Sequence, residues 1–402
     1  MQMKHIGVIG GGQLALMMGT AAQKLGVKLI VQTPNTDDPA VSIASDTIFA
    51  AVDDATATAE LAKHCDAITF ENEFINIEAL SQLATEKVCF RPRIEALSPL
   101  LDKYHQRCFL QDLGIPVPKF ILPESLFTVL KSQEEQYREN NRSQESELQF
   151  PAVLKARRHG YDGQGTFIVE DLLSLEKKLY QNHPDKKPKY NLIKSRYLLE
   201  EFIPFQKELS VIAARSTSGE ISTFVVVETQ QEQQVCRRVI APADISPQTE
   251  KAVKDIACNV LDNLQVVGVF AIELFLTNSG EVLVNEIAPR THNSGHFSID
   301  ACYTSQFEQH LRVVCDLPLG NVAMKIPYAI MVNLLGYETR KHDYIDKRSK
   351  LAQIPGAYVH WYGKSESRPG RKLGHITVLF DKLNRDEAMT IAKNIESIWY
   401  SE

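Results

Sequence analysis

Two glutamates in a predicted β-hairpin are the residues of this 402-residue chain best suited to chemistry. Apolar segments at 268–276 and 281–287 flank a turn sequence, which predicts two antiparallel strands. If the turn centres on Ser279-Gly280, Glu273 lies directly opposite Glu286, and directly paired side chains sit about 5 Å apart. Two bare carboxylates at that distance would repel, so we expect a divalent cation such as Mg²⁺ between them.

A dense set of hydrogen-bond donors follows the hairpin. It begins at Asn285 and includes Arg290, His292, Asn293 and His296. Such a set beside metal-type carboxylates predicts a site for an anion. Two structural alternatives stay open: one glutamate pairs with Arg290 or with a lysine, and the histidines serve only the core.

Two glycine-rich loops are candidates for binding phosphate. The first, Gly10 to Ala15, follows a strand and opens a helix, as in dinucleotide-binding turns. The next strand runs into Gln32-Thr33-Pro34, where a ribose-binding acid is needed, so we expect this turn to pack helix on strand and not to bind NAD.

The second loop, Lys155 to Gly165, lies between two predicted strands, so it is not a Walker loop, which opens a helix. Three glycines in six residues predict a mobile flap with free amide donors. Lys155 could reach a nucleotide phosphate as a point charge. The alternative is a solvent-exposed hairpin turn.

The elements that must position these residues can be traced along the chain. Strands at 5–9, 27–31 and 67–70, with a helix to about Leu25, predict a Rossmann-like unit. The polar segments 131–149 and 181–190 are expected at the surface. Further strands are predicted at 152–156, 166–169, 197–202, 209–214, 223–227, 328–334, 357–361 and 375–380, and helices at 101–113, at 247–264 and from Asp386.

Composition excludes several classes of protein. With 44% apolar and 23% charged residues, the chain has ordinary globular proportions. The net charge of −6 argues against an extended nucleic-acid surface. No apolar run approaches the roughly 20 residues of a membrane helix. Seven scattered cysteines without a CxxC pair fit reduced thiols, so we expect a cytoplasmic enzyme.

At this point the residues resemble the ATP-grasp enzymes. The matching features are Lys155, the GYDGQG loop, the strand end Glu200-Glu201-Phe202-Ile203, Glu208, and Glu273 with Asn285-Glu286. More closely, the chain is similar to the ATP-dependent carboxylases of purine biosynthesis that act on aminoimidazole ribonucleotide. That likeness covers almost the whole chain and rests on GVIGGGQL, on TFENE at 69–73, on NEIAPRTHNSGH from Asn285 and on RPGRKLGH from Arg368.

The resemblance implies a mixed α/β and α+β fold of three domains. These are a Rossmann-like domain at 1–100, a two-lobed ATP-grasp domain at 101–320 with a flap lobe at about 118–198, and a small C-terminal domain at 321–402. It implies that ATP phosphorylates bicarbonate to carboxyphosphate, and that the amine of 5-aminoimidazole ribonucleotide is then carboxylated, directly or through CO₂. It also implies a homodimer with small-molecule partners, and neither nucleic acid nor membrane.

The resemblance also implies roles for individual residues. Glu273 and Glu286 would hold Mg²⁺. The residues implied around ATP are Lys103, Lys155, Gly160, Tyr161, Asp162, Gly163, Gln164, Gly165, Thr166, Glu200, Glu201, Phe202, Ile203, Glu208, Gln231, Asn285 and Glu286. Those implied around the bicarbonate-derived intermediate are Arg290, His292 and Asn293, with Tyr161 and Asp162 beside the ribonucleotide as further catalytic residues. Those implied to bind the ribonucleotide are Gln13, Leu14, Glu73, Lys364, Arg371 and Lys372.

Two positions depart from the family pattern, and three other functions compete. Gln164 stands where many members carry a basic residue, which puts the grip of the flap in doubt. Gln231 stands where a histidine often contacts the nucleotide. The rivals are a related ATP-grasp ligase such as a formate-dependent glycinamide ribonucleotide transformylase, a NAD-dependent oxidoreductase, and a nucleotide-binding protein without catalysis.

Overall fold

The computed structural model describes residues 3–121, 149–158, 160, 165–181, 196–382 and 384–401. The chain divides into two compact units. The first unit comprises residues 1–98, 207–274 and 287–402, and the second comprises residues 99–206 and 275–286. Among the described helices, none is both long enough and apolar enough to cross a membrane. The polar segments expected at 131–149 and 181–190 fall almost wholly outside the described residues.

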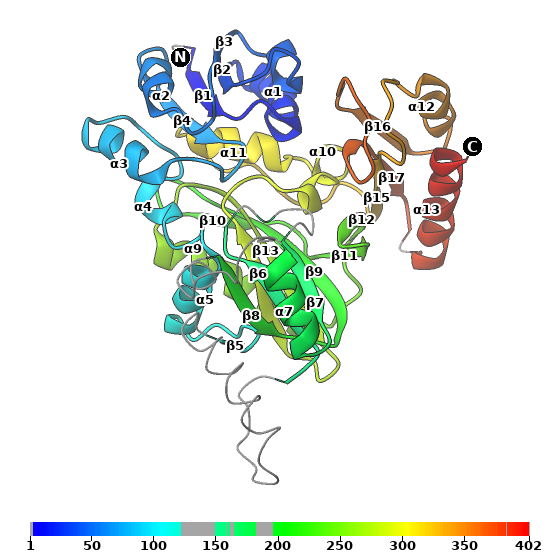
Figure 1. The fold of residues 1–402 in the computed structure, drawn as a ribbon. Coiled ribbons are helices and arrows are strands. Elements are labelled where there is room, and N and C mark those ends of the chain that lie inside the picture. The colour runs from blue at the N-terminus through cyan, green and yellow to red at the C-terminus, as the bar shows by residue number, and fades with distance from the viewer. Residues whose placement is uncertain are drawn as a thin grey trace, which may run out of the picture. The chain divides into compact units, whose positions relative to one another are not determined.

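The fold is mixed α/β, as expected, with helices and strands interspersed along the chain (Figure 1). The described helices are α1 Gln13–Leu25, η1 Pro39–Ser42, α2 Ala55–Ala62, α3 Ile77–Thr85, α4 Ile94–Leu97, α5 Lys103–Asp112, α7 Leu172–Gln181, α9 Pro247–Leu264, η2 Asn293–Gly295, α10 Ser298–Ala301, α11 Gln306–Val314, α12 Ile345–Leu351 and α13 Arg385–Tyr400. The described strands are β1 His5–Ile9, β2 Lys28–Thr33, β3 Asp46–Phe49, β4 Ala67–Phe70, β5 Phe120–Ile121, β6 Ala152–Ala156, β7 Thr166–Val169, β8 Tyr197–Glu201, β9 Phe205–Arg215, β10 Ile221–Thr223, β11 Val227–Glu232, β12 Val235–Ala241, β13 Gly268–Thr277, β14 Val282–Ala288, β15 Tyr328–Leu335, β16 Ala357–Trp361 and β17 Lys372–Phe380.

The N-terminal sheet is Rossmann-like, as predicted. Its four strands run in the order β3-β2-β1-β4, and all its pairs are parallel. Parallel strands bury both faces, which explains the apolar run in β1. Helix α1 ends at Gly26, whose φ of 66° is the left-handed conformation that glycine adopts at little cost. The apolar face of α1 shares one core with α11, far along the chain.

The first glycine loop is closed by the protein's own carboxylate. The Leu14 amide at the start of α1 donates to Glu71 Oε1 at 3.3 Å. A Cβ at Gly12 would lie 2.4 Å from the same oxygen, and one at Gly11 would lie 2.5 Å from Thr33 Oγ1. A helix N-terminus attracts negative charge. Glu71 therefore takes the position that a phosphate has in dinucleotide-binding proteins, which fits the expectation that this loop does not bind NAD.

A nine-stranded sheet joins the middle of the chain to its C-terminal part. Its order is β14-β13-β9-β11-β12-β15-β17-β16, with β10 paired to β9. Helix α13 covers β15 with its buried side, and the indole of Trp399 donates to the Leu335 carbonyl at 2.8 Å. A core of apolar residues from β15, β17, α12 and α13 lies beneath it.

The second unit contains a smaller sheet in the order β5-β8-β6-β7. Strand β6 pairs antiparallel with β7 and β8, with Lys155 opposite Thr166 and Leu198. Helix α7 contributes Leu175 and Leu179 to the core that this sheet covers. The flanking strands predicted for the second glycine loop are therefore correct.

Two sequence expectations about strands and turns are wrong. The segment 223–227 does not form one strand, because β10 ends at Thr223 and β11 begins only at Val227. The hairpin of β11 and β12 was not predicted. That hairpin turns at Gln233 and Gln234, both with positive φ (52° and 64°), where Asn-Gly is the usual signal.

The turn before β14 also differs from the expected two-residue turn. The Thr277 amide donates to the Glu281 carbonyl at 2.9 Å, and the Gly280 amide donates to the Thr277 carbonyl at 3.0 Å. Gly280 has a φ of 83°. The connection is therefore a three-residue loop with a glycine bulge, and counting Glu273 directly opposite Glu286 from a two-residue turn was wrong.

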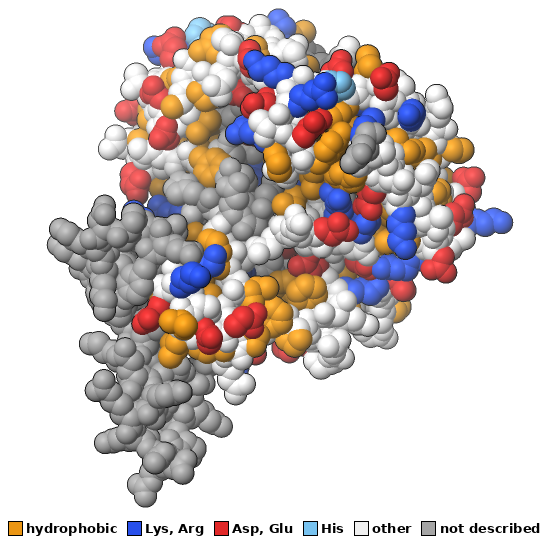
Figure 2. Space-filling view, turned by 45° about the vertical axis from the view of Figure 1, so that its right-hand side comes forward, with side chains coloured by type: hydrophobic (Ala, Val, Ile, Leu, Met, Phe, Trp, Pro, Cys, Tyr) orange, Lys and Arg blue, Asp and Glu red, His pale blue; other side chains and the backbone are white. Residues whose placement is uncertain are grey.

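Acidic and basic side chains are interspersed over the face shown in Figure 2, in keeping with the small net charge of −6. The seven cysteines are all free thiols. Burial raises the pKa of Cys302 to about 12, so this thiol stays protonated and packs as a small apolar group.

Candidate active site

Lys155, the predicted phosphate lysine, is buried in the second unit. Its ammonium lies 2.7 Å from Glu200 Oε2 and donates to Asn285 Oδ1 at 2.8 Å. Burial lowers the pKa of Lys155, and the charges of Arg107 and Lys103 lower it further, against the opposing effect of Glu200. Strands β6, β8 and β14 thus bring together three residues that sequence reasoning had placed in one nucleotide site.

Arg107 of α5 completes this cluster, and sequence reasoning missed it. Its Nε lies 2.7 Å from Glu200 Oε1, and its guanidinium donates to the Asn285 carbonyl at 2.6 Å. Burial alone would raise the pKa of Glu200, but the charges of Arg107 and Lys155 outweigh it and hold that pKa at about 2. The available signal was helical spacing, because Lys103 and Arg107 are four residues apart and share one face of α5.

The resemblance implied Glu200 among the residues around ATP, and its side chain takes a supporting position instead of facing outward. Its side chain is 1% exposed and turned inward between two cations. Its carboxylate therefore holds Lys155 and Arg107. Beyond it, Glu201 and Phe202 are half-buried and Ile203 is buried.

Glu286 lies beside a cation. Lys103 Nζ is 2.5 Å from Glu286 Oε1, so the alternative of an ion pair with a lysine is realised at this glutamate. Burial would raise the pKa of Glu286, but the charges of Lys103, Lys155 and Arg107 outweigh it and keep that pKa below its ordinary value. Glu286 is therefore an anion, and in this structure the ammonium of Lys103 balances its charge.

The flap residues Tyr161, Asp162, Gly163 and Gln164 lie outside the described residues. At the described end of the loop, Gly165 has a φ of 82°, and its carbonyl accepts from the Ala156 amide at 2.7 Å. Gly160 and Thr166 are half-buried.

The two remaining predicted nucleotide residues lie on neighbouring strands of the first unit. Glu208 on β9 is half-buried and faces Thr229 of β11. Gln231 on β11 is exposed beside a bulge between Gln230 and Gln231. Their proposed contacts with ATP stay predictions.

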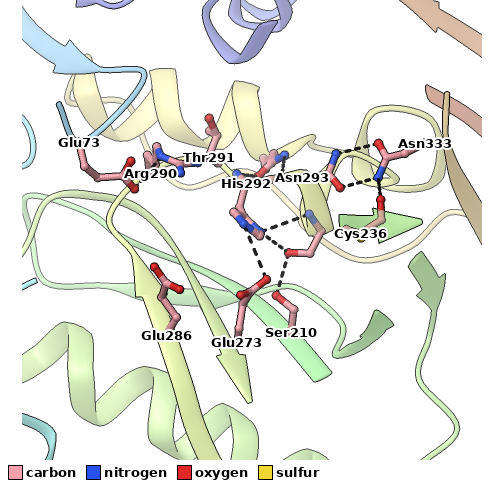
Figure 3. Close-up of polar contacts among 12 residues, drawn as sticks. Glu73, Ser210, Cys236, Glu273, Glu286, Arg290, Thr291, His292, Asn293 and Asn333 are labelled. Carbon is pink, nitrogen blue, oxygen red and sulfur yellow. Dashed lines mark hydrogen bonds and ion pairs between the residues drawn. The ribbon is translucent and has the colours of Figure 1, made fainter. Parts of the chain in front are cut away.

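The predicted anion site is well ordered by contacts within the first unit (Figure 3). Arg290 Nε lies 2.8 Å from Glu73 Oε1, which links the strand end after β14 to the loop after β4. This ion pair joins a residue predicted for the bicarbonate-derived intermediate to one predicted for the ribonucleotide.

Asn293 is held by a buried amide that sequence reasoning missed. Asn293 Nδ2 donates to Asn333 Oδ1 at 2.9 Å, and Asn333 Nδ2 returns a bond to Asn293 Oδ1 at 2.7 Å. Asn333 also donates to the Cys236 carbonyl at 2.8 Å. Its position in the apolar strand β15 gave no signal, because only tertiary packing sets its amide against Asn293.

His292 points toward a predicted metal ligand. Its Nε2 lies 3.7 Å from Glu273 Oε1, and its Nδ1 contacts Ser294 (Figure 3). The main chain of His292 is fixed by Gln306, which accepts from its amide at 2.9 Å and donates to its carbonyl at 2.7 Å. Glu273 and His292 are thus brought together, and the roles proposed for them and for Asn293 stay predictions.

Three of the predicted ribonucleotide residues meet, although they come from opposite ends of the chain: Gln13, Lys364 and Lys372. Lys364 Nζ donates to Gln13 Oε1 at 2.7 Å and to the Lys372 carbonyl at 2.7 Å. Arg371 donates to the Glu366 carbonyl at 2.8 Å. Burial lowers the pKa of Arg371, and the neighbouring Arg368 lowers it further. Such a cationic cluster suits a phosphate group.

A group of mostly buried aromatic and acidic side chains joins α10 to strands β16 and β17. His360 Nε2 lies 2.8 Å from Asp300 Oδ2, and Tyr362 Oη lies 2.7 Å from His375 Nδ1. The two histidine rings stack with centroids 4.4 Å apart at 14°. A metal binds in the plane of an imidazole, so two nearly parallel rings cannot both ligate one ion. This group is therefore a hydrogen-bonded support of the site.

Comparisons with known proteins agree with this geometry. Residues 3–99 match a ribonucleotide synthetase preATP-grasp domain, residues 108–307 an ATP-grasp domain, and residues 329–388 a phosphoribosylaminoimidazole carboxylase C-terminal domain. The chain is 50% identical over 400 residues to the N5-carboxyaminoimidazole ribonucleotide synthase of Synechococcus elongatus, covering 98% of this chain and 95% of the relative.

Solved structures give the same likeness. A carboxyaminoimidazole ribonucleotide synthase of Aspergillus clavatus complexed with ATP is 30% identical with a TM-score of 0.84, covering 98% of both chains. Another from that organism, in complex with ADP and 5-aminoimidazole ribonucleotide, is 29% identical with a TM-score of 0.82, again covering 98% of both chains.

Proposed function

The chain belongs to the N5-carboxyaminoimidazole ribonucleotide synthase family of ATP-grasp ligases, and from this premise we propose how its residues divide the reaction. The enzyme carboxylates 5-aminoimidazole ribonucleotide at the expense of ATP, a step of purine biosynthesis. In our proposal bicarbonate is the carbon source and carboxyphosphate the intermediate. The observation that carries the proposal is that Lys155, Asn285 and Glu286 lie in one cationic cluster, with the ribonucleotide residues gathered elsewhere in the chain.

The nucleotide end of the site is proposed to bind ATP through Lys103 and Lys155, with the flap residues Gly160–Thr166 covering the phosphates. Phosphoryl transfer depends on positioning and charge neutralisation more than on a protein nucleophile. Glu200 and Asn285 contact the Lys155 ammonium, and Arg107 holds Glu200 in place, so the charge of Lys155 is pre-oriented.

Mg²⁺ is proposed to be held by Glu273 and Glu286. The donor set fits this ion, because carboxylate oxygens are the ligands that Mg²⁺ prefers, and the lowered pKa keeps Glu286 ionised. When bound, the ion would neutralise charge on the transferred phosphoryl group.

The intermediate is proposed to lie against Arg290, His292 and Asn293, and the ribonucleotide against Gln13, Leu14, Glu73, Lys364, Arg371 and Lys372. The Arg290–Glu73 ion pair connects the two groups. Carboxyphosphate hydrolyses readily, so water must be excluded when it forms. The proposal also includes three domains, at 1–100, 101–320 and 321–402. It further includes a homodimer and a cytoplasmic location.

The test is phosphate release from MgATP, measured with bicarbonate and with or without aminoimidazole ribonucleotide. We expect release that depends on both substrates, together with a carboxylated product. The rival transformylase would instead release phosphate with formate and glycinamide ribonucleotide, and the match of residues 329–388 does not favour it. Absence of phosphate release with the ribonucleotide and bicarbonate would overturn the proposal.

A further inference from the structure

A chain of hydrogen bonds leads from the middle of β9 to His292 (Figure 3). Ser210 Oγ lies 2.7 Å from Ser294 Oγ, and Ser294 Oγ lies 2.9 Å from His292 Nδ1. The backbone amide of Ser294 also donates to that nitrogen, at 3.3 Å. Ser210 is fully buried and Ser294 is 1% exposed, so solvent does not replace these bonds.

The backbone amide of Ser294 shows the direction of every bond in this chain. An amide N–H can only donate, so His292 Nδ1 must be the acceptor. The Ser294 hydroxyl, which also meets this nitrogen, therefore donates its single proton to it. Its oxygen then accepts the proton of the Ser210 hydroxyl. A ring nitrogen that accepts carries no proton, so the ring proton lies on Nε2, on the side of Glu273.

We propose that Ser210 and Ser294 are positioning residues that hold His292 in its Nε2–H tautomer. His292 then presents a hydrogen-bond donor, and not a base, toward an oxygen of the bicarbonate-derived group. This inference rests on the proposed function for the identity of that group. It does not rest on it for the tautomer, which follows from the contacts of the three residues alone.

The serines are better explained by this role than by packing. Ser210 lies between Leu209 and Val211 in a strand whose neighbouring residues are buried and mostly apolar. A buried hydroxyl costs free energy unless it is hydrogen-bonded, and alanine would fill much the same space. The partner of Ser210 is the hydroxyl that contacts His292, so the polar pair serves the orientation of that ring.

The direct test is the tautomer itself, measured by ¹⁵N NMR of enzyme labelled at histidine. Protonated and unprotonated ring nitrogens have distinct ¹⁵N shifts, and the His292 signals are assigned among the 11 histidines by comparison with His292→Gln. We expect Nε2–H in the wild type. In Ser294→Ala only the longer amide bond of 3.3 Å still favours that tautomer, so we expect a share of Nδ1–H to appear beside Nε2–H. A wild-type signal from Nδ1–H would overturn the inference.

Kinetics give the second readout. Because one orienting hydrogen bond is worth about 1 kcal/mol, we expect kcat to fall about fivefold in Ser210→Ala, and about tenfold in Ser294→Ala, where the bond to the ring itself is lost. The KM for ATP should stay unchanged. Ser210→Thr keeps the hydroxyl on a strand that tolerates β-branched residues, and we expect it to restore both the tautomer and kcat.

The matched control is Ser216→Ala, which removes another buried serine just after β9. Its hydroxyl contacts Ser218 and the Glu220 amide and does not touch His292. We expect neither the tautomer nor kcat to change. If the alanine variants of Ser210 and Ser294 also leave both unchanged in an active enzyme, the inference is wrong. If the wild type shows Nε2–H but no ribonucleotide-dependent turnover, the proposed function fails and the positioning role stands.

Discussion

The carboxylate of Glu200 supports the cationic cluster of the second unit, and we expect Glu200→Gln to destabilise that unit. Glutamine keeps the shape of the side chain and removes its charge. Arg107 and Lys155, each 2.7 Å from a Glu200 oxygen, would then be buried without their common counter-ion. Removing one member of a buried ion pair is costly because it strands the other charge.

The magnitude follows from the pKa of Glu200. Folding lowers the pKa of Glu200 from 4.5 to about 2. A difference of one pKa unit corresponds to about 1.36 kcal/mol. The ionised carboxylate therefore contributes about 3 kcal/mol of stability at neutral pH. Removing one partner of a buried ion pair in other proteins costs roughly 3–5 kcal/mol, which agrees with this value for Glu200.

The pH dependence has a definite sign. A carboxyl whose pKa is lowered by folding contributes stability above its unfolded pKa, which is lost as pH falls through the folded value. The free-energy gap between wild type and Glu200→Gln should therefore narrow from about 3 kcal/mol at pH 7 to about 2 kcal/mol at pH 3.5.

Native-state hydrogen exchange of amides in β6 and β8 is the suitable assay, because it reports opening of this unit alone. Tryptophan fluorescence would not serve, since Trp361 and Trp399 both lie in the first unit. Glu170→Gln is the matched control, because this exposed residue loses the same charge. An opening free energy within about 1 kcal/mol of wild type at pH 7, or a gap independent of pH, would refute the reasoning.

Three further results are expected. Glu273→Gln and Glu286→Gln should each abolish turnover and leave the circular dichroism spectrum native, because loss of an anionic metal ligand removes several kcal/mol of transition-state stabilisation. Near-normal phosphate release at modest Mg²⁺ concentration would exclude the metal role. Arg371→Ala should raise the KM for the ribonucleotide about ten- to hundredfold and leave the KM for ATP unchanged, since a charge-assisted phosphate contact is worth roughly 1.5–3 kcal/mol. A raised KM for ATP with an unchanged KM for the ribonucleotide, in steady-state kinetics, would show that the acceptor site is misplaced. Asn333→Leu should lower the free energy of unfolding by about 2 kcal/mol and should lower kcat, because the Asn293 amide loses both its bonds to Asn333. Unfolding in urea followed by tryptophan fluorescence measures the first effect, and wild-type values would show that the amide pair does not orient Asn293.

The sequence by itself determined most of the strands and four of the longer helices, α1, α5, α9 and α13. The strand at 5–9, the helix at 247–264 and the hairpin strands around Gly280 follow from apolar periodicity and turn residues, which act over a few positions. The same local reasoning failed at β11 and β12, where polar residues and a Gln-Gln turn form strands because β9 and β15 supply partners on either side. It also misjudged the loop at 278–280, where a glycine bulge adds one residue to the turn.

The sequence also named most of the candidate site, because motif residues such as Lys155, Asn285 and Arg290 stand in recognisable local patterns. It did not find Arg107, Asn333 or Ser210, which lie in ordinary helical or apolar stretches. Nor did it foresee that the Glu200 side chain turns inward to hold Lys155. The physical reason is that a buried polar group must satisfy its charge and hydrogen bonds with whatever tertiary packing brings beside it. Such partners lie far away in the sequence, as Asn285 lies 178 positions from Arg107.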